Sequence, residues 1–246
     1  MLLYTLLEVA ANAAQDLGQG FTMREIWEAS GFIARSVIVV LAIMLIACTY
    51  VALERLIAFN RARSQSMKLA AEVVAPLQQG DITTALSLAR DDRFKAAYLG
   101  SLLKAGLAEV EERFDPHAIQ NGERAVGKSI VEEQGKLRRG MAILATTGST
   151  APFVGLFGTT FGVINAFQGM ATAGSGLASV SKGIAEALIT TGVGIGVAVV
   201  GVWFFNYFNG RIEKVTDEMT ASEADFMDWA YKLLHDREEA QKKAGK

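Results

Sequence analysis

The chain has 246 residues, of which 51% are hydrophobic, 24 are glycine and only 3 are proline. This composition favours a helical membrane protein over an ordinary soluble domain, although the length allows one domain or two. The formal charge of -2 at pH 7 excludes an overall field that would attract nucleic acid or acidic substrates. The single cysteine, Cys48, excludes an intrachain disulfide and a multi-cysteine metal site.

The first thirty residues begin with an apolar run but lack the pattern of a secretory signal. No lysine or arginine occurs before Arg24, and the run is interrupted by Glu8 and followed by Asp16. A positively charged start is typical of a signal peptide. We therefore predict that residues 1–30 form an amphipathic helix resting on the outer membrane surface, with a signal peptide as the alternative.

Three later stretches are apolar for about the 20 residues that are needed to cross the hydrocarbon core of a bilayer. The first, 31–53, is rich in Val, Ile and Leu and is broken only by Arg35 near its end. The second, 140–169, and the third, 184–208, are rich in Gly, Ala and Thr instead. We expect the first span to face lipid and the other two to pack closely against helices.

Between the first two spans, over 54–139, apolar residues recur at helical spacing and strand patterns are absent. Helix breaks are predicted before Asp81, which can cap the next helix, and at Asp115, which precedes a proline. The helix that opens there is expected to continue from Ala118 into the second span without interruption. No breaker occurs in Asn206–Tyr231, so the third span is also expected to continue beyond the membrane as one helix.

The distribution of basic residues predicts the orientation of the chain. One basic residue precedes the first span, thirteen lie from Arg55 to Arg138, one lies between the second and third spans, and seven follow Asn209. Because lysine and arginine accumulate on the cytoplasmic side, the middle segment and the C-terminus are expected to be cytoplasmic. The predicted fold is an all-α membrane protein with long cytoplasmic helical extensions. Its segments are the periplasmic segment 1–30, span 31–53, cytoplasmic domain 54–139, span 140–169, periplasmic loop 170–183, span 184–208, and cytoplasmic helix with tail 209–246.

One short motif suggests a nucleotide site, and its surroundings argue against that interpretation. Residues Gly122–Ser129 read GERAVGKS and match the phosphate-loop pattern G-x-x-x-x-G-K-[ST]. That pattern binds phosphate only between a buried strand and a helix, whereas here the preceding FDPHAIQN is no strand. The two histidines, His117 and His235, lie far apart in the sequence. We expect no nucleotide binding, no catalytic set, no metal site and no cofactor, and hence no enzyme.

The second and third spans each carry a row of small residues at helical spacing. The row in the second span consists of Pro152, Gly155, Thr159, Gly162 and Ala166. The row in the third span consists of Ala187, Thr191, Gly194, Ala198 and Gly201. Such rows let helix backbones approach closely, so the two are expected to meet or to line a pore, with plain helix packing as the alternative for any single glycine.

Glu186 is a carboxylate near the start of an otherwise uncharged span. Exposing it to lipid would cost on the order of 3 kcal/mol, so it is expected to face protein or water. A carboxyl group can take up and release a proton, and the hydroxyls of Thr159, Thr190 and Thr191 can both donate and accept hydrogen bonds. These four residues are the candidate ion pathway. The alternative is that Glu186 reaches the outer surface beside Lys182, four residues earlier.

The motifs STAPFVGLFGTTFGVINAF and GIAEALITTGVGIGVAVVGVWFFN, in this order of spans, resemble the MotA/TolQ/ExbB proton-channel family, and in particular its ExbB and TolQ branch. The resemblance implies a homopentamer in the bacterial inner membrane, assembled around a pair of helices from a single-span subunit of the ExbD/TolR kind. A membrane aspartate of that partner would take up the proton. By motif position, Thr159, Glu186 and Thr191 would be polar pathway residues. The chain differs in having Val200 where ExbB-like chains carry proline.

The resemblance also implies a function. The chain would be a stator-like subunit that converts proton motive force into mechanical work on a TonB/TolA-like protein or a motility effector, and no nucleic acid partner is expected. Three jobs stay open, namely outer-membrane uptake, envelope integrity and surface motility, as does the choice between H+ and Na+. The alternative function is a passive oligomeric membrane scaffold that conducts no ion.

Overall fold

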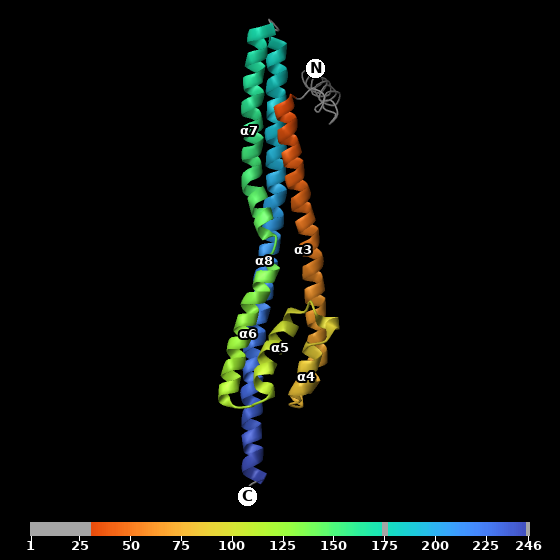
Figure 1. Ribbon diagram of the computed structural model, residues 1–246, viewed down its shortest axis with the longest axis vertical. Helices are drawn as coiled ribbons and strands as arrows, with labels where there is room; N and C mark the ends of the chain where they lie inside the picture. Colours follow the sequence, from red (N-terminus) through yellow and green to blue (C-terminus); the bar gives the residue numbers. More distant parts are fainter. Residues whose placement is uncertain (1–30, 174–176, 245–246) are drawn as a thin grey trace, which may run out of the picture. The chain divides into compact units, whose positions relative to one another are not determined.

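The computed structural model describes residues 31–173 and 177–244, with side chains except at 172–173, 177–179, 182 and 244. Its regular elements are all helices, and no strand occurs in these two ranges (Figure 1). In chain order the elements are α3 (Phe32–Gln78), α4 (Ile82–Ala89), the 3-10 turn η1 (Asp92–Phe94), α5 (Tyr98–Glu111), α6 (Pro116–Leu137), α7 (Met141–Ala173) and α8 (Leu177–Ala244).

Three of these helices, α3, α7 and α8, are long and apolar enough to cross a membrane, which confirms the prediction of three spans. Helix α7 continues to Ala173 and α8 begins at Leu177, so helical structure enters the predicted loop 170–183 from both sides. The amphipathic helix predicted for 1–30 lies outside the described residues. The side of the membrane on which each end lies stays a prediction.

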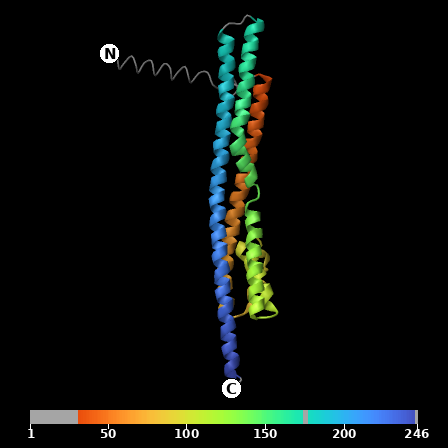
Figure 2. The same cartoon turned by 90° about the vertical axis from the view of Figure 1, so that its left-hand side faces the viewer.

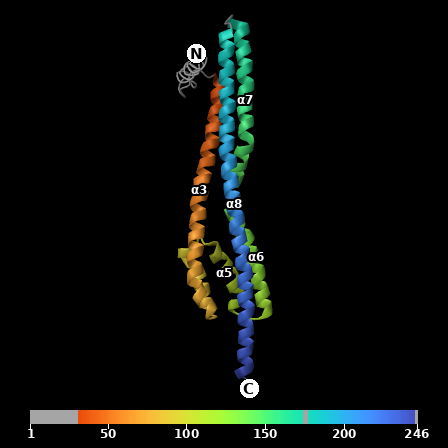
Figure 3. The same ribbon diagram turned by 180° about the vertical axis from the view of Figure 1, so that it is seen from behind.

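The helices form two compact units. The first, which we name the span unit, contains the described residues up to Cys48 together with Ile143–Trp203. The second, which we name the extension unit, contains Thr49–Ala142 and the described residues from Phe204 onward. Within the span unit, the parts of α3, α7 and α8 lie side by side in all three views (Figures 1, 2 and 3).

The core of the span unit is narrow and is built from all three helices. It contains Val37 and Leu41 of α3, Ala151 of α7, and Val197 and Ala198 of α8. Large apolar side chains on the same helices point outward, and those at least half exposed include Ile43, Ile46, Phe153, Leu156, Phe157, Leu188 and Ile195. An apolar surface of this extent is unfavourable in water and suits a lipid environment.

In the extension unit, the continuations of α3 and α8 pack with α4, α5 and α6. The rings of Phe59 on α3 and Phe208 on α8 stack with their centroids 5.9 Å apart. Between α5 and α8, the Tyr98 hydroxyl donates a hydrogen bond to Glu218 at 2.7 Å, and burial together with this carboxylate raises the pKa of Tyr98. These contacts join segments that lie more than a hundred residues apart in the sequence.

Two predicted helix starts are confirmed by their capping geometry. The Asp81 carboxylate accepts a hydrogen bond from the Thr84 amide at 3.0 Å and caps α4. The Asp115 carboxylate accepts one from the Ala118 amide at 2.8 Å and caps α6, with proline in its first turn. The carboxylates satisfy amides at helix starts that have no partner within the helix.

The prediction that one helix runs from Ala118 into the second span is wrong. Helix α6 ends at Leu137 and α7 begins at Met141, because Gly140 between them adopts a left-handed φ of +75°. This break is packed from one side, since a methyl group on Gly140 would lie 2.9 Å from a Val51 methyl carbon. The buried guanidinium of Arg55 donates to the Lys136 carbonyl at 3.1 Å and pairs with Glu54. Arg55 therefore places a positive charge at the C-terminal end of α6, where the helix dipole favours it.

We predict that Gly140→Ala lowers the free energy of unfolding by about 2 kcal/mol. The left-handed backbone is sterically unfavourable for alanine, and the added methyl group would also contact Val51. Gly135→Ala is the matched control, since nothing lies within 4 Å of its substituent position inside α6. The control is expected to be neutral or stabilising. Thermal unfolding of the full chain in detergent measures both, and equal midpoints for the two variants would contradict the role of Gly140.

Candidate functional site

The candidate site is the contact between α7 and α8 in the span unit. A methyl group on Gly155 would lie 2.9 Å from the Thr190 carbonyl oxygen, and one on Gly194 would lie 2.7 Å from the Ala151 carbonyl oxygen. Farther along the same contact, one on Gly201 would lie 2.8 Å from a backbone nitrogen of α7. These spaces admit hydrogen and nothing larger, so the two backbones touch directly. Close approach of this kind gives membrane helices their van der Waals packing.

The small-residue row of the third span lies on this contact, with Ala187, Gly194, Ala198 and Gly201 buried. The row of the second span is less regular. Gly155 and Ala166 are buried, whereas Pro152, Thr159 and Gly162 are only half-buried. The contact face of α7 is therefore rotated away from Pro152 and Thr159.

Several contact residues were not predicted. They are Gly148, Ala151 and Gly158 on α7, which are buried against α8. Together with Gly155 and Gly162 they alternate steps of three and four residues, the spacing of a packed helix pair. That alternation is visible in the sequence and could have identified the face.

The threonine hydroxyls differ in their hydrogen bonding. Thr190 is 1% exposed and donates to the Ala187 carbonyl at 2.7 Å, and Thr159 donates to the Leu156 carbonyl at 2.8 Å. Both are therefore satisfied by their own helices. The hydroxyl of Thr191 is buried and has no hydrogen-bond partner among the described residues. A buried polar group without a partner is uncommon and calls for a physical reason.

Glu186 lies one turn before Thr190 on α8 and is half-buried. It makes no ion pair or hydrogen bond with any described side chain, and the side chain of Lys182, its predicted alternative partner, lies outside those described. The structure brings Glu186, Thr190 and Thr191 together within two turns of α8. No hydrogen bond among the described residues links Thr159 to them across the helix pair.

The phosphate-loop pattern lies within an uninterrupted helix. Residues Gly122–Ser129 belong to α6, and Lys128 lies 3.9 Å from Glu132, one turn on. Their backbone N–H groups are used inside the helix and are not turned toward a phosphate. The local geometry that this motif needs is therefore missing here.

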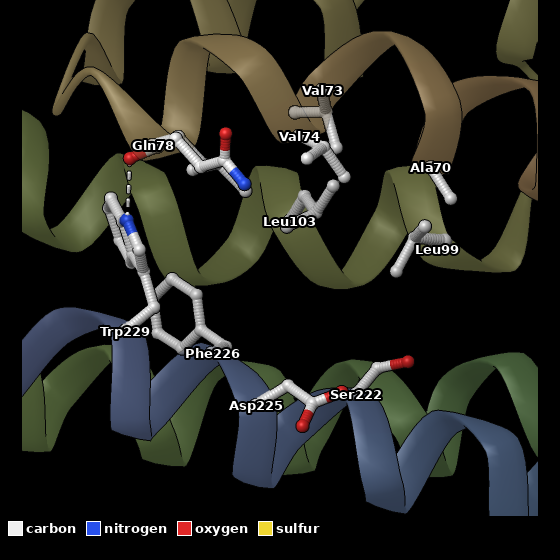
Figure 4. A pocket seen from close by; sticks show the side chains of 11 residues that line it. Ala70, Val73, Val74, Gln78, Leu99, Leu103, Ser222, Asp225, Phe226 and Trp229 are labelled. Carbon is white, nitrogen blue, oxygen red and sulfur yellow. Dashed lines mark hydrogen bonds between the residues drawn. The ribbon is translucent and has the colours of Figure 1, made fainter.

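An apolar cavity of about 300 Å³ lies in the extension unit between α3, α5 and α8. Figure 4 shows Val73 and Val74 of α3 facing Leu103 of α5, with Phe226 and Trp229 of α8 on the opposite side. The Trp229 indole nitrogen donates to the Leu77 carbonyl at 2.8 Å and closes one end. Among its lining residues only Asp225 carries a charge, so the cavity offers hydrophobic contact rather than catalysis.

The fold and the site together define a helical membrane protein with three spans, of which the second and third pack through small residues beside a buried threonine. A family model described as the MotA/TolQ/ExbB proton channel family matches residues 95–221, more than half of the 246 residues. The chain belongs to this family.

Individual relatives point to the ExbB and TolQ branch. The Tol-Pal system protein TolQ of Pseudomonas aeruginosa is 40% identical over 123 residues, which cover 49% of this chain and 53% of that protein. The biopolymer transport protein ExbB of Xanthomonas campestris is 42% identical over 88 residues, covering 35% of each. The ExbB of Pseudomonas putida is 53% identical over 70 residues, covering 28% of this chain and 21% of that protein. The chain thus spans about half or less of the length of these relatives.

We predict that Gly194→Val separates α7 from α8, because its side chain would overlap the Ala151 carbonyl, and that it lowers stability by about 2 kcal/mol or more. Gly192→Val on the same helix is the matched control, since nothing lies within 4 Å of that position. Thermal unfolding in detergent compares the pair. A larger loss for Gly192→Val than for Gly194→Val would contradict the contact described above.

Proposed function

We propose that this chain is the channel subunit of an inner-membrane machine that converts proton motive force into mechanical work. The observation that carries the proposal is the buried, unpaired hydroxyl of Thr191 on the α7–α8 contact, in a chain of the MotA/TolQ/ExbB family. Such a hydroxyl can accept a hydrogen bond from one side and donate to the other. It therefore suits a path along which protons move.

In the proposed mechanism, Glu186 takes up a proton near the start of the third span, and Thr191 lies little more than one turn farther along α8. Thr190 and Thr159 border this path from their own helices. One charge crossing 100 mV releases about 2.3 kcal/mol, several times the thermal energy. That energy is enough to bias a conformational step in a helix that contacts the small-residue face.

The proposed assembly is a homopentamer around a pair of helices from a single-span partner of the ExbD/TolR kind, whose membrane aspartate carries the proton. The N-terminus of this chain lies in the periplasm and both the 54–139 segment and the C-terminus lie in the cytoplasm. The similarity to relatives named for the Tol-Pal system and for biopolymer transport supports the proposal that the complex exerts force on a TonB/TolA-like protein in the periplasm. Motility is the remaining possibility for the output.

We expect Glu186→Gln and Thr191→Val each to reduce proton flux by about tenfold, equivalent to about 1.4 kcal/mol. Glu186→Gln removes the carboxyl group that takes up the proton, and Thr191→Val removes a hydroxyl that can both donate and accept a hydrogen bond. The measurement is the flux of protons into liposomes that contain the full chain with its co-purified partners, under an imposed membrane potential.

Thr160→Val is the matched control for Thr191→Val. The Thr160 hydroxyl is exposed and donates to the Leu156 carbonyl of its own helix at 3.0 Å, so its removal is expected to leave flux unchanged. Unaltered flux in both pathway variants would remove the proposed path. Absence of any flux in the parent complex would favour the passive scaffold.

A further inference from the structure

A cationic pocket of about 530 Å³ lies in the extension unit between α3 and α8. Its lining residues are Asn60, Arg63, Ser64, Met67, Lys68 and Arg211. Three of the six are positively charged and none is a carboxylate. The pocket therefore carries an uncompensated positive charge and suits an anion.

Two cations of this pocket lack a direct carboxylate partner among the described residues, although the charge of Arg63 acts on Tyr98, which donates to Glu218. Arg63 and Lys68 form no ion pair or hydrogen bond with any described residue. Arg211 donates to the Tyr207 hydroxyl at 2.8 Å and lies over its ring at 5.3 Å from the centroid, so its described partner is neutral.

Another pocket of the extension unit also contains cations, but it has carboxylates in its lining. Between α5 and α6, four cations share a pocket with three carboxylates, and Lys136 pairs with Glu133 at 2.6 Å. Lys128 lies 3.9 Å from Glu132 and Arg90 lies 4.0 Å from Glu111, so three of the four cations are paired with a carboxylate. Of these two pockets, only the α3–α8 pocket has cations in its lining and no carboxylate.

The pocket also lies just beyond the apolar surface of both helices. On α3, Ile57 is 68% exposed, and Arg63 follows about 9 Å farther along the helix axis. On α8, the exposed Tyr207 precedes Arg211 by one turn. Tyrosine at the end of an apolar span is typical of the membrane interface. Arg211 follows the predicted end of the third span, residue 208, by three residues, so an anion bound to it would lie near the lipid headgroups.

The two walls of the pocket are held together by packing. Phe59 on α3 and Phe208 on α8 precede the pocket residues in the sequence, and their rings stack on each other. Their side chains are buried, at 4% and 2% exposed. Ile212, next to Arg211, is fully buried. The cations therefore converge from two helices whose separation is fixed, and an anion does not have to bring them together.

We propose that this pocket binds the phosphate of an anionic phospholipid headgroup. The guanidinium groups of Arg63 and Arg211 bind phosphate oxygens with two parallel N–H donors each, and Lys68 adds a point charge. Basic pockets between membrane helices hold such lipids on the cytoplasmic side. The acyl chains lie along the exposed apolar surface next to Ile57, which a soluble phosphate ester cannot use. The site needs only a chain that spans a membrane, and it does not depend on ion conduction.

The test is lipid binding by the full chain in mild detergent, measured by native mass spectrometry with phosphatidylglycerol and phosphatidylcholine of identical acyl chains. The parent chain is expected to retain phosphatidylglycerol preferentially. Removing a basic residue weakens binding by about fivefold, so Arg63→Gln with Lys68→Gln is expected to weaken phosphatidylglycerol binding by about 25-fold. Binding of phosphatidylcholine is expected to stay unchanged.

Lys104→Gln with Lys128→Gln is the matched control, because it removes the same charge from the pocket between α5 and α6, whose lining contains carboxylates. Equal retention of the two lipids by the parent chain, or an equal loss in the control, overturns the proposal. Displacement of phosphatidylglycerol by an equal concentration of glycerol phosphate assigns the pocket to free phosphate esters instead and also overturns it.

Folding of each variant is checked by thermal unfolding. Lys68 is exposed, so the single change Lys68→Gln leaves the packing intact and is expected to reduce binding by about fivefold on its own. Arg211→Lys keeps the charge but loses the forked donors, and it is expected to keep a preference for phosphatidylglycerol over phosphatidylcholine. A loss of phosphatidylglycerol binding in Arg211→Lys larger than the roughly 25-fold loss in the double variant would contradict a site held mainly by charge.

Discussion

The direct backbone contact between α7 and α8 is the constraint on which the span unit depends. Lipid chains are as apolar as leucine, so helices in a membrane gain little from burying large side chains against each other. They gain instead from close approach, which requires glycine or alanine wherever one helix touches the other. Gly155 and Gly194 meet that requirement, because a methyl group on either would come within 3 Å of a backbone oxygen of the other helix. The large side chains of the same helices consequently point outward.

That constraint also explains the polar chemistry of the site. The backbone of α8 at Thr190 and Thr191 lies against Gly155 of α7, and the Thr190 hydroxyl lies against Gly158, so both threonines are placed in this close contact. Thr190 is satisfied by a carbonyl of its own helix, whereas Thr191 is not. Among the described residues, the Thr191 hydroxyl is the one buried side-chain oxygen that has no hydrogen-bond partner. A partner outside the described residues, such as an ion, a water molecule or another subunit, can satisfy it.

The parts of the fold that follow from local chemistry could be predicted from the sequence. Three apolar runs predicted three spans, and aspartates at 81 and 115 predicted helix starts because a carboxylate can bond to free amides. The continuity of α6 with α7 was mispredicted. Gly140 provides the break, but the chain has 24 glycines and the sequence does not show which of them ends a helix. The left-handed backbone of Gly140 packs against Val51, a contact that is known only from the structure.

The candidate site was predicted more completely on α8 than on α7. On α8 the predicted row and the buried face coincide at four of five positions, with Thr191 half-buried. On α7 the contact follows Ala151, Gly155 and Gly158, so Pro152 and Thr159 lie at its edge. The rotation of a helix about its axis is set by its neighbours, here including Val37 of α3 beside Gly158. Sequence periodicity alone does not contain that information.

The central claim is that this chain works as the channel subunit of a machine with a single-span partner. The most direct measurement is to isolate the tagged chain from native membranes in mild detergent and to identify and count its companions by mass spectrometry. The account predicts a small protein with a single span and an aspartate in that span, present in fewer copies than this chain. Recovery of this chain alone, or with proteins that lack such a span, would contradict the claim.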